Sequence, residues 1–482
     1  MQYFAVIFLS FHYITIFCKM QYPECLAFET QVWYNKGKGG GLMKIPEQIA
    51  EILAKLETAG FEAYVVGGCV RDEIMGKTAH DYDITTSAEP QETERVFGDC
   101  RVVETGIKHG TVTVLYKGLS VEITTFRVDG DYPDSRHPSE VSFSKNIKDD
   151  LARRDFTMNA IAYSPKRGII DPFGGESDIK ARIIRCVGEP EKRFFEDALR
   201  VLRALRFSAE LGFAIDDKTS EALFAKKDTL AKVSKERTFS ELKRLLCGDN
   251  VKNVLIEYRE VFAEIIPELR EMFDYEQNSR FHNSTLFVHT ARAVEAAPKT
   301  AVMRLAMLFH DIGKPFCRTT DENGEGHYYG HAGKSAEIAE RVLRELKCDN
   351  ALRMNVCEII KYHDIPVELS ERIIRKRLAR YGTERFRDIM EAHIADDSAK
   401  QDFCLERTEN ERKAIEIAEK IAAEKPCLSL RELAISGKDL KEIVPPSPKM
   451  GEVLKKLLGE VVDGSLPNER EALLNRAKEL LR

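Results

Sequence analysis

The pattern of apolar positions changes about a third of the way along the chain. From Ile45, apolar residues recur at helical spacing up to a stop at Gly60. Runs rich in β-branched and aromatic residues then predict four strands, at 64–66, 81–85, 111–116 and 120–126. After Ile179 the strand signals fade, and amphipathic helices are predicted at 193–211, 234–246, 286–297, 301–309 and 336–346. The pattern therefore predicts an α+β fold, in which a small mixed-sheet head is followed by an all-helical body.

Shifts in this pattern divide the chain into five predicted segments. They are an N-terminal extension, the head, two helical domains and a helical tail, at 1–42, 43–178, 179–275, 276–400 and 401–482. Residues 4–17 are almost wholly apolar, but the run is too short to span a bilayer comfortably. The codons of residues 38–40 (KGG) can read as a ribosome-binding site ahead of a start at Met43. We expect residues 1–42 to be a non-native extension; the alternative is a membrane anchor.

Composition narrows the class of protein without identifying a partner. The 482 residues include 73 Lys and Arg against 79 Asp and Glu, so any nucleic-acid site must be a local basic face. The 11 cysteines are scattered and show no CxxC spacing. They are typical of reduced thiols in a cytoplasmic protein, and they indicate neither a disulfide framework nor a zinc ribbon.

The head carries a phosphate-type turn followed by paired carboxylates. Residues 67–72 (GGCVRD) run from a predicted strand through a glycine turn into a helix, which lets backbone N–H groups approach phosphates. Arg71 can add a charge-assisted bond to a triphosphate. Asp81 and Asp83, two apart on a predicted strand, would share a face and suit Mg²⁺, and Glu122 on a neighbouring strand is a candidate third ligand. The alternative is a glycine-rich turn beside a solvated pair of aspartates.

Three further blocks follow along the chain, at 153–160 (RRDFTMNA), 171–175 (DPFGG) and 196–207 (EDALRVLRALRF). In the last block, three residues span slightly less than one helical turn, because a turn holds about 3.6 residues. Side chains three apart therefore differ by about −60° in their direction around the helix axis. Asp197 and Arg200 are therefore predicted to be neighbours, whereas Arg203 and Arg206 slant progressively away. The alternative for this block alone is ordinary ion pairing on an exposed helix.

In this order, the blocks resemble the class II tRNA nucleotidyltransferase and poly(A) polymerase family of the polymerase-β-like superfamily. Residues 435–440 (ISGKDL) are also similar to that family. The resemblance implies a polymerase-β-like nucleotidyltransferase head, a helical neck and an RNA-binding body. It implies Mg²⁺-dependent, template-independent addition of CCA to the 3′ end of tRNA from CTP and ATP. Poly(A) polymerase shares every catalytic block, and the GKD segment favours tRNA.

The resemblance also implies roles for individual residues. Catalysis would fall to the carboxylates Asp81, Asp83 and Glu122, of which Asp81 and Asp83 would bind Mg²⁺. Nucleotide binding would fall to Gly67, Gly68, Arg71, Arg154, Asp155, Asp197, Arg200, Arg203 and Arg206. In the family, Asp197 would accept a hydrogen bond from the exocyclic amino group of C or A, and Arg200 would donate to the acceptor edge. Because both bases present an amino group and an acceptor, one site can select them and refuse G and U.

A second constellation lies in the helical part, where seven of the 11 histidines fall between His282 and His393. Imidazoles and carboxylates on successive helices can chelate a divalent metal and activate water. The set resembles the HD phosphohydrolase domain, whose ligand positions match His289, His310, Asp311, His331 and His363, with Asp396 as a later carboxylate. The resemblance implies a second divalent transition metal and phosphatase or phosphodiesterase activity. The alternatives are an inactive helical scaffold and, for the whole chain, an HD phosphohydrolase with a vestigial head.

The tRNA is expected to be held through its phosphates by basic helix faces. The candidates are Lys235, Arg237 and the run 372–377 (RIIRKR). The polar loop 129–142 is expected to govern how many nucleotides are added. No membrane partner and a cytoplasmic location are predicted.

Overall fold

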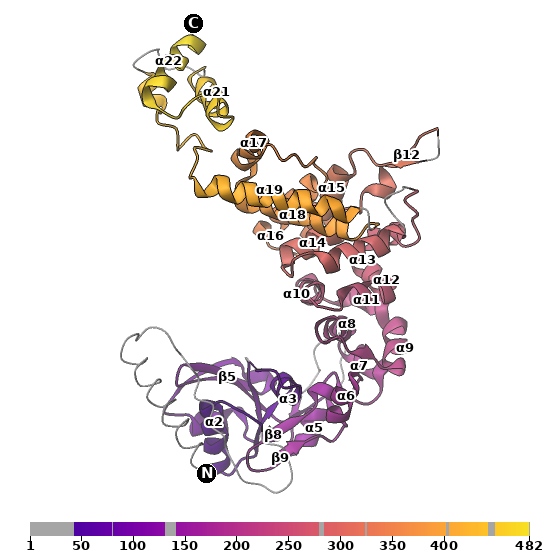
Figure 1. Ribbon diagram of the computed structural model, residues 1–482. Coiled ribbons are helices and arrows are strands. Elements are labelled where there is room, and N and C mark those ends of the chain that lie inside the picture. Colours follow the sequence, from indigo (N-terminus) through magenta and orange to yellow (C-terminus); the bar gives the residue numbers. More distant parts are fainter. Residues whose placement is uncertain are drawn as a thin grey trace, which may run out of the picture. The chain divides into compact units, whose positions relative to one another are not determined.

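The computed structural model describes residues 43–79, 81–130, 141–278, 284–322, 325–401, 404–441 and 449–481 (Figure 1). The chain forms two compact units that divide after Ala181. The predicted extension 1–42, most of the loop 129–142, and His282 lie outside the described residues.

The first unit is built on a seven-stranded mixed sheet in the order β3-β4-β5-β2-β1-β8-β9. Only the β2–β5 pair is parallel among these neighbours. The strands are β1 (Ala63–Val66), β2 (Asp83–Thr86), β3 (Arg101–Gly106), β4 (Thr111–Tyr116), β5 (Leu119–Thr125), β8 (Ala162–Ser164) and β9 (Gly168–Ile170). A separate pair is formed by β6 (Arg127–Asp129) and β7 (Val141–Phe143). The helices of the first unit are α2 (Glu47–Thr58), α3 (Gly68–Ile74), α4 (Pro90–Val96), α5 (Ile147–Ala152) and α6 (Gly175–Ala181).

Strands β1, β2, β4 and β5 lie close to their predicted ranges, whereas β3, β8, β9 and the β6–β7 pair were not predicted. One further difference affects the site. Helix α2 buries the periodic apolar residues Ile49, Ile52, Leu53 and Leu56, as its sequence pattern predicts. The strand predicted at 81–85 begins two residues later, at Asp83, so Asp81 lies in the segment before β2. The prediction that both aspartates stand on one strand is therefore wrong.

The second unit is helical, and together with the mixed sheet of the head it confirms the predicted α+β organisation. Its first helices are α7 (Pro190–Glu196), α8 (Leu199–Leu211), α9 (Asp217–Lys226), α10 (Lys235–Leu246), α11 (Val251–Glu257), α12 (Arg259–Ile265), α13 (Leu286–Ala296) and α14 (Ala301–Phe309). They are followed by α15 (His331–Glu345), α16 (Asn350–Tyr362), α17 (Glu371–Tyr381), α18 (Thr383–Ser398), α19 (Leu405–Ala423), α20 (Gly437–Leu440), α21 (Lys449–Val462) and α22 (Arg470–Leu481). Two short strand pairs interrupt them: parallel β10 (Ile183–Ile184) with β11 (Ala214–Ile215), and antiparallel β12 (Thr319–Thr320) with β13 (Gly326–His327).

The helix predicted at 193–211 is broken in the structure. Helix α7 ends at Glu196, Asp197 has extended backbone angles (φ −142°, ψ 104°), and α8 begins at Leu199. The Leu199 N–H donates to Asp197 Oδ1 at 3.0 Å. An aspartate that accepts a bond from a nearby backbone N–H offers the chain an alternative to continuous helix, which explains the break.

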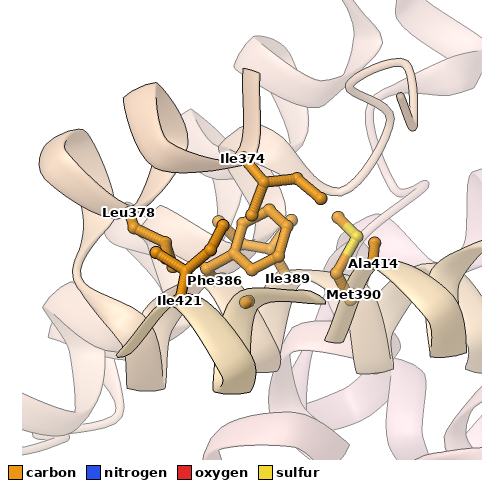
Figure 2. Packing of buried hydrophobic residues seen from close by; sticks show 8 residues of the cluster. Ile374, Leu378, Phe386, Ile389, Met390, Ala414 and Ile421 are labelled. Atoms are coloured by element: carbon orange, nitrogen blue, oxygen red, sulfur yellow. The ribbon is translucent and has the colours of Figure 1, made fainter. Parts of the chain in front are cut away.

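Helices α17, α18 and α19 share a core of their own (Figure 2). Ile374 and Leu378 of α17 pack against Phe386 and Met390 of α18 and Ile421 of α19, all at most 2% exposed. A separate apolar cluster joins the segment around Leu433 and Leu440 to α21 and α22. The shared core fixes α19 against α18, which carries residues of the histidine site.

Among the described residues, no helix combines the length and the apolar content that crossing a membrane requires.

Candidate functional site

Two guanidinium groups lie over the glycine pair that follows β1. Gly67 has φ 81°, a conformation that favours glycine, and its N–H donates to Ile161 O at 3.1 Å. A Cβ placed on Gly67 would lie 3.0 Å from Arg154 Nη1, and one on Gly68 would lie 3.8 Å from Arg71 Nη2. The first unit thus brings together four of its predicted nucleotide-binding residues.

A chain of hydrogen bonds orients the buried Arg71. Its Nη1 donates to Asn159 Oδ1 at 2.8 Å, and its Nε and Nη2 donate to Asp72 Oδ1 at 2.9 and 2.7 Å. Asn159 Nδ2 in turn donates to Asp155 Oδ1 at 3.2 Å, and the Phe156 N–H donates to the same oxygen at 2.8 Å. Asp155 is 7% exposed, so here it supports Asn159 from within the protein.

Sequence reasoning missed Asn159 as a site residue. Asn159 lies within the block 153–160, but Arg71 and Asn159 are 88 positions apart, and only the fold shows that they meet. The only sign in the sequence was that Asn159 is an amide within a block whose other polar residues are mostly charged.

At the edge of this cluster, Asp83 interacts electrostatically with Asp81, Glu122 and Arg154. Strands β2 and β5 are parallel with Ile84 paired to Ile123, so Asp83 and Glu122, one residue earlier on each strand, share a face of the sheet. Neighbouring protein atoms partly remove water from Asp83 and raise its pKa, although the side chain keeps exposed surface. The charges of Asp81 and Glu122 add to this rise, and the Arg154 charge opposes it. A carboxylate that stands near two others suits a hard divalent cation, which removes the repulsion between their charges.

The predicted base-recognition residues in the second unit already have protein partners. Asp197 Oδ2 accepts from Arg237 Nη2 at 2.8 Å, in addition to capping α8. Arg200, 9% exposed, donates through Nη1 to Glu196 Oε2 at 2.7 Å and to Arg193 O at 3.1 Å. Arg237, predicted as a phosphate contact, is therefore a partner of Asp197.

Arg206 does not fit its predicted nucleotide role. It is 2% exposed, its Nη1 donates to Glu210 Oε2 at 2.6 Å, and its Nε donates to Glu241. Arg203 keeps 33% of its side chain exposed, with Nη1 3.9 Å from Glu241 Oε1. The helical drift carries Arg206 into the packing between α8 and α10, where it forms a structural ion pair.

The basic run in α17 is also engaged in ion pairs. Arg372 lies 2.8 Å and Lys376 3.4 Å from Asp463 of the segment after α21, and Arg375 lies 3.1 Å from Glu424. Such exposed pairs are weak and exchange readily with other anions.

The predicted histidine site forms around Asp311, directly after α14. His289 Nε2 of α13 lies 3.5 Å and His310 Nε2 3.2 Å from Asp311 Oδ2. Asp396 Oδ1 of α18 lies 3.0 Å from His289 Nε2 and 3.5 Å from His310 Nε2. These four side chains can hold one metal ion.

The second carboxylate oxygen of Asp311 faces another pair of imidazoles. His331 Nε2, at the start of α15, lies 3.3 Å from Asp311 Oδ1, and His363 Nε2, after α16, lies 3.7 Å from it. The two imidazole nitrogens are 3.3 Å apart. This group can hold a second ion, with Asp311 shared between the two positions.

Backbone carbonyls set the orientation of these imidazoles. The Nδ1 atoms of His310, His331 and His363 lie 2.7, 2.8 and 2.7 Å from the carbonyl oxygens of Met307, Tyr328 and Ile360. A carbonyl can only accept, so the proton belongs on Nδ1 and the Nε2 lone pair faces inward.

The donor set fits a transition metal. Buried Asp311 Oδ2 and Asp396 Oδ1 have no hydrogen-bond partner of good geometry. Lys314 Nζ lies 2.6 Å from Asp311 Oδ2, and Lys400 Nζ lies 2.7 Å from Asp396 Oδ2. Burial disfavours the charged form of His310, yet the neighbouring Asp311 raises its pKa to about 9, so in the metal-free protein its Nε2 also carries a proton, which a metal ion would replace. Imidazole nitrogens and carboxylates are the ligands that such metals prefer.

Comparison with known proteins gives consistent matches along the chain. The Poly A polymerase head domain matches residues 63–185, the probable RNA and SrmB-binding site of polymerase A matches 212–273, and a putative tRNA nucleotidyltransferase domain 2 matches 330–477. A CCA-adding enzyme of Lactobacillus delbrueckii subsp. bulgaricus is 34% identical over 428 residues, which cover 88% of this chain and 96% of that protein. One of Enterococcus faecalis is 34% identical over 444 residues, covering 91% and 98%. The crystal structure of the Bacillus stearothermophilus CCA-adding enzyme in complex with CTP has 31% identity and a TM-score of 0.71, over 90% of this chain and 96% of that one.

Proposed function

Because the chain belongs to the family of CCA-adding enzymes, we propose that it adds C, C and A to the 3′ end of tRNA from CTP and ATP, without a nucleic-acid template. The observation that carries this proposal is the cluster of the first unit. It combines a glycine turn under two guanidinium groups with three carboxylates that repel one another.

Within that cluster we propose separate roles. Asp81 and Asp83, with Glu122 beside them, would hold Mg²⁺, which supplies charge neutralisation for the attacking 3′ hydroxyl and the leaving pyrophosphate. Arg71 and Arg154, lying over the glycine pair, would bind the triphosphate, since guanidinium groups match phosphate oxygens in pairs. Asp155 would act through Asn159 by keeping Arg71 in place.

In the second unit we propose that Asp197 and Arg200 select the base. Each would exchange a protein partner for the base edge: Asp197 its bond from Arg237, and Arg200 its bond to Glu196. A base that cannot replace these bonds leaves buried polar groups unpaired, at a cost of about 1–3 kcal/mol each. The neck and RNA-binding body would occupy residues 179–275, the HD domain 276–400 and the tail 401–482.

The experiment is nucleotide addition on matched RNAs. Transcripts of one tRNA ending before CCA, after C and after CC are incubated with each nucleotide alone and with CTP plus ATP. We expect CTP to extend the first two and ATP only the third, with growth stopping at CCA. Long A tails on unrelated RNA would establish the poly(A) polymerase alternative. Absence of any addition would leave a hydrolase with a vestigial head.

A second activity is favoured by one specific observation, the convergence of inward-facing imidazoles and carboxylates on the two oxygens of Asp311. We propose that this HD site binds two divalent transition metal ions and hydrolyses phosphate esters. Metal analysis of the purified protein should give two ions per chain, and phosphatase activity should disappear on chelation and return with Mn²⁺ or Ni²⁺. A metal-free protein whose chelation changes no activity would contradict this proposal.

We further propose a cytoplasmic location. The nine described cysteines are all free thiols, as expected in a reducing compartment, and nucleotides and tRNA are found there.

A further inference from the structure

A pocket of about 400 Å³ opens beside the histidine site, between the end of α16, helix α18 and helix α19. Its lining includes His363 from one of the two metal groups and Asp396 from the other. A molecule in this pocket can therefore reach both metal positions at once. The volume lies in the range of small-molecule sites and is far below that of a folded RNA.

His393 lines the same pocket and belongs to neither metal group. It precedes Asp396 by three residues on α18, so both side chains stand on one face of the helix. Its ring is hydrogen-bonded to the backbone of Tyr362, whereas Nε2 is buried without a hydrogen-bond partner. With the ring proton directed to a backbone carbonyl, Nε2 presents a lone pair that only a donor can satisfy.

The rest of the pocket is polar on one side and apolar on the other. Lys400, whose Nζ donates to Asp396 and Asp397, lines it together with Arg407 and Asn410, which stand on α19. Residues 365–367 (IPV) provide apolar surface. The core in Figure 2, where Met390 of α18 lies near Ala414 of α19, holds these two helices together, and Ile365 and Val367 pack against it. The pocket is therefore preformed.

We propose that this pocket binds the alcohol part of a small phosphate ester hydrolysed at the HD site, and that His393 Nε2 accepts a hydrogen bond from a hydroxyl group of that alcohol. The inference rests on the proposed HD hydrolase. In the reaction, water gives its hydroxyl to phosphorus, the ester P–O bond breaks, and the remaining proton of the water goes to the alcohol oxygen. His393 exchanges no proton in this step and acts as a specificity-determining residue.

The test uses two esters that differ in hydroxyl groups, glycerol 3-phosphate and propyl phosphate, with the full-length protein loaded with Mn²⁺. We expect the parent to prefer glycerol 3-phosphate by about tenfold in kcat/KM, because an unpaired buried acceptor penalises the ester without the hydroxyl. His393→Phe should reduce this preference to about one, because neither ester then finds the acceptor that distinguishes them. His393→Gln, which keeps an acceptor, should retain part of the preference.

The matched control is His327→Phe, a histidine outside the pocket that is bound to Asp321, and it should keep the parent's preference. If the parent shows no preference, or His393→Phe keeps it, the pocket inference is overturned while the hydrolase stands. If neither ester is hydrolysed, the proposed hydrolase activity is wrong, and the pocket is then tested by measuring the binding of both esters by calorimetric titration. Equal binding of the two esters to the parent would then overturn it.

Discussion

Replacing Asp197 separates its structural role from its proposed role in base selection. The carboxylate caps α8 through the Leu199 N–H and pairs with Arg237, whose side chain is 28% exposed against 19% for Asp197. Loss of a capping side chain costs about 1 kcal/mol, and a partly exposed ion pair contributes up to about 1 kcal/mol. Asp197→Ala should therefore lower the free energy of unfolding by about 1–2 kcal/mol, whereas Asp197→Asn keeps the capping oxygen and should lose less.

Selection among nucleotides should change in both variants. Alanine leaves the amino group of C or A without its acceptor, and asparagine adds a donor that suits the carbonyl of U or G. A change of about 1–3 kcal/mol corresponds to a 5- to 150-fold loss of discrimination. The assay measures single-nucleotide addition to tRNA with each of the four nucleotides, alongside urea unfolding.

A matched control exists in the same unit. Asp216 caps α9 through the Thr219 N–H and pairs with Arg185, but the family resemblance gives it no contact with a base. Asp216→Ala should lose similar stability and retain full discrimination. If both Asp197 variants refuse UTP and GTP as the parent does, base selection by Asp197 is wrong.

Four further outcomes follow from the structure. Joint replacement of Asp81 and Asp83 by Ala should abolish nucleotide addition while tRNA binding, measured by filter retention, persists; measurable addition would contradict their metal role. His310→Ala should remove bound transition metal and phosphatase activity yet spare CCA addition, and loss of addition at normal stability would tie the HD site to polymerisation. Arg206→Leu should lower the free energy of unfolding by about 3–5 kcal/mol, because the buried Glu241 loses its partner, with nucleotide discrimination unchanged. Burial, helped by the charge of His363, lowers the pKa of His393 to about 4, so unfolded chains bind its proton first and stability should fall by about 3 kcal/mol between pH 6.5 and 4; His393→Phe should flatten that part of the urea-unfolding profile.

The sequence predicted the glycine turn and four of the seven strands of the head's sheet because these depend on local signals, whereas β3, β8 and β9 were not predicted. The histidine site was predicted from its resemblance to the HD domain. The apolar residues of α2 recur at helical spacing, and those of β4 alternate as in a strand with one buried face. The metal-type residues stand at or near helix ends, which tertiary packing brings together. The break at Asp197 escaped prediction because the flanking residues favour helix, and one side-chain bond to the Leu199 N–H outweighs them.

Burial was the other property that sequence could not provide. Arg200, Arg203 and Arg206 recur at the same spacing in the sequence, yet Arg206 is buried against Glu241 on α10, whereas Arg203 keeps 33% of its side chain exposed near the same glutamate. Which arginine is buried against α10 depends on the rotation of α8 and on the position of a helix 35 residues away. Likewise, Asn159 became visible only through its bond to Arg71.

The bonds from Asp155 through Asn159 to Arg71 have a kinetic consequence. A free arginine side chain carries about 2 kcal/mol of rotamer entropy, which binding must remove. Here the guanidinium is already fixed by Asn159 and Asp72, so little further motion is lost when a triphosphate arrives. An enzyme that binds a new nucleotide for each residue it adds gains this advantage at every addition. Weakening the Asn159 bond should therefore slow nucleotide binding in each round, by a similar factor from one round to the next.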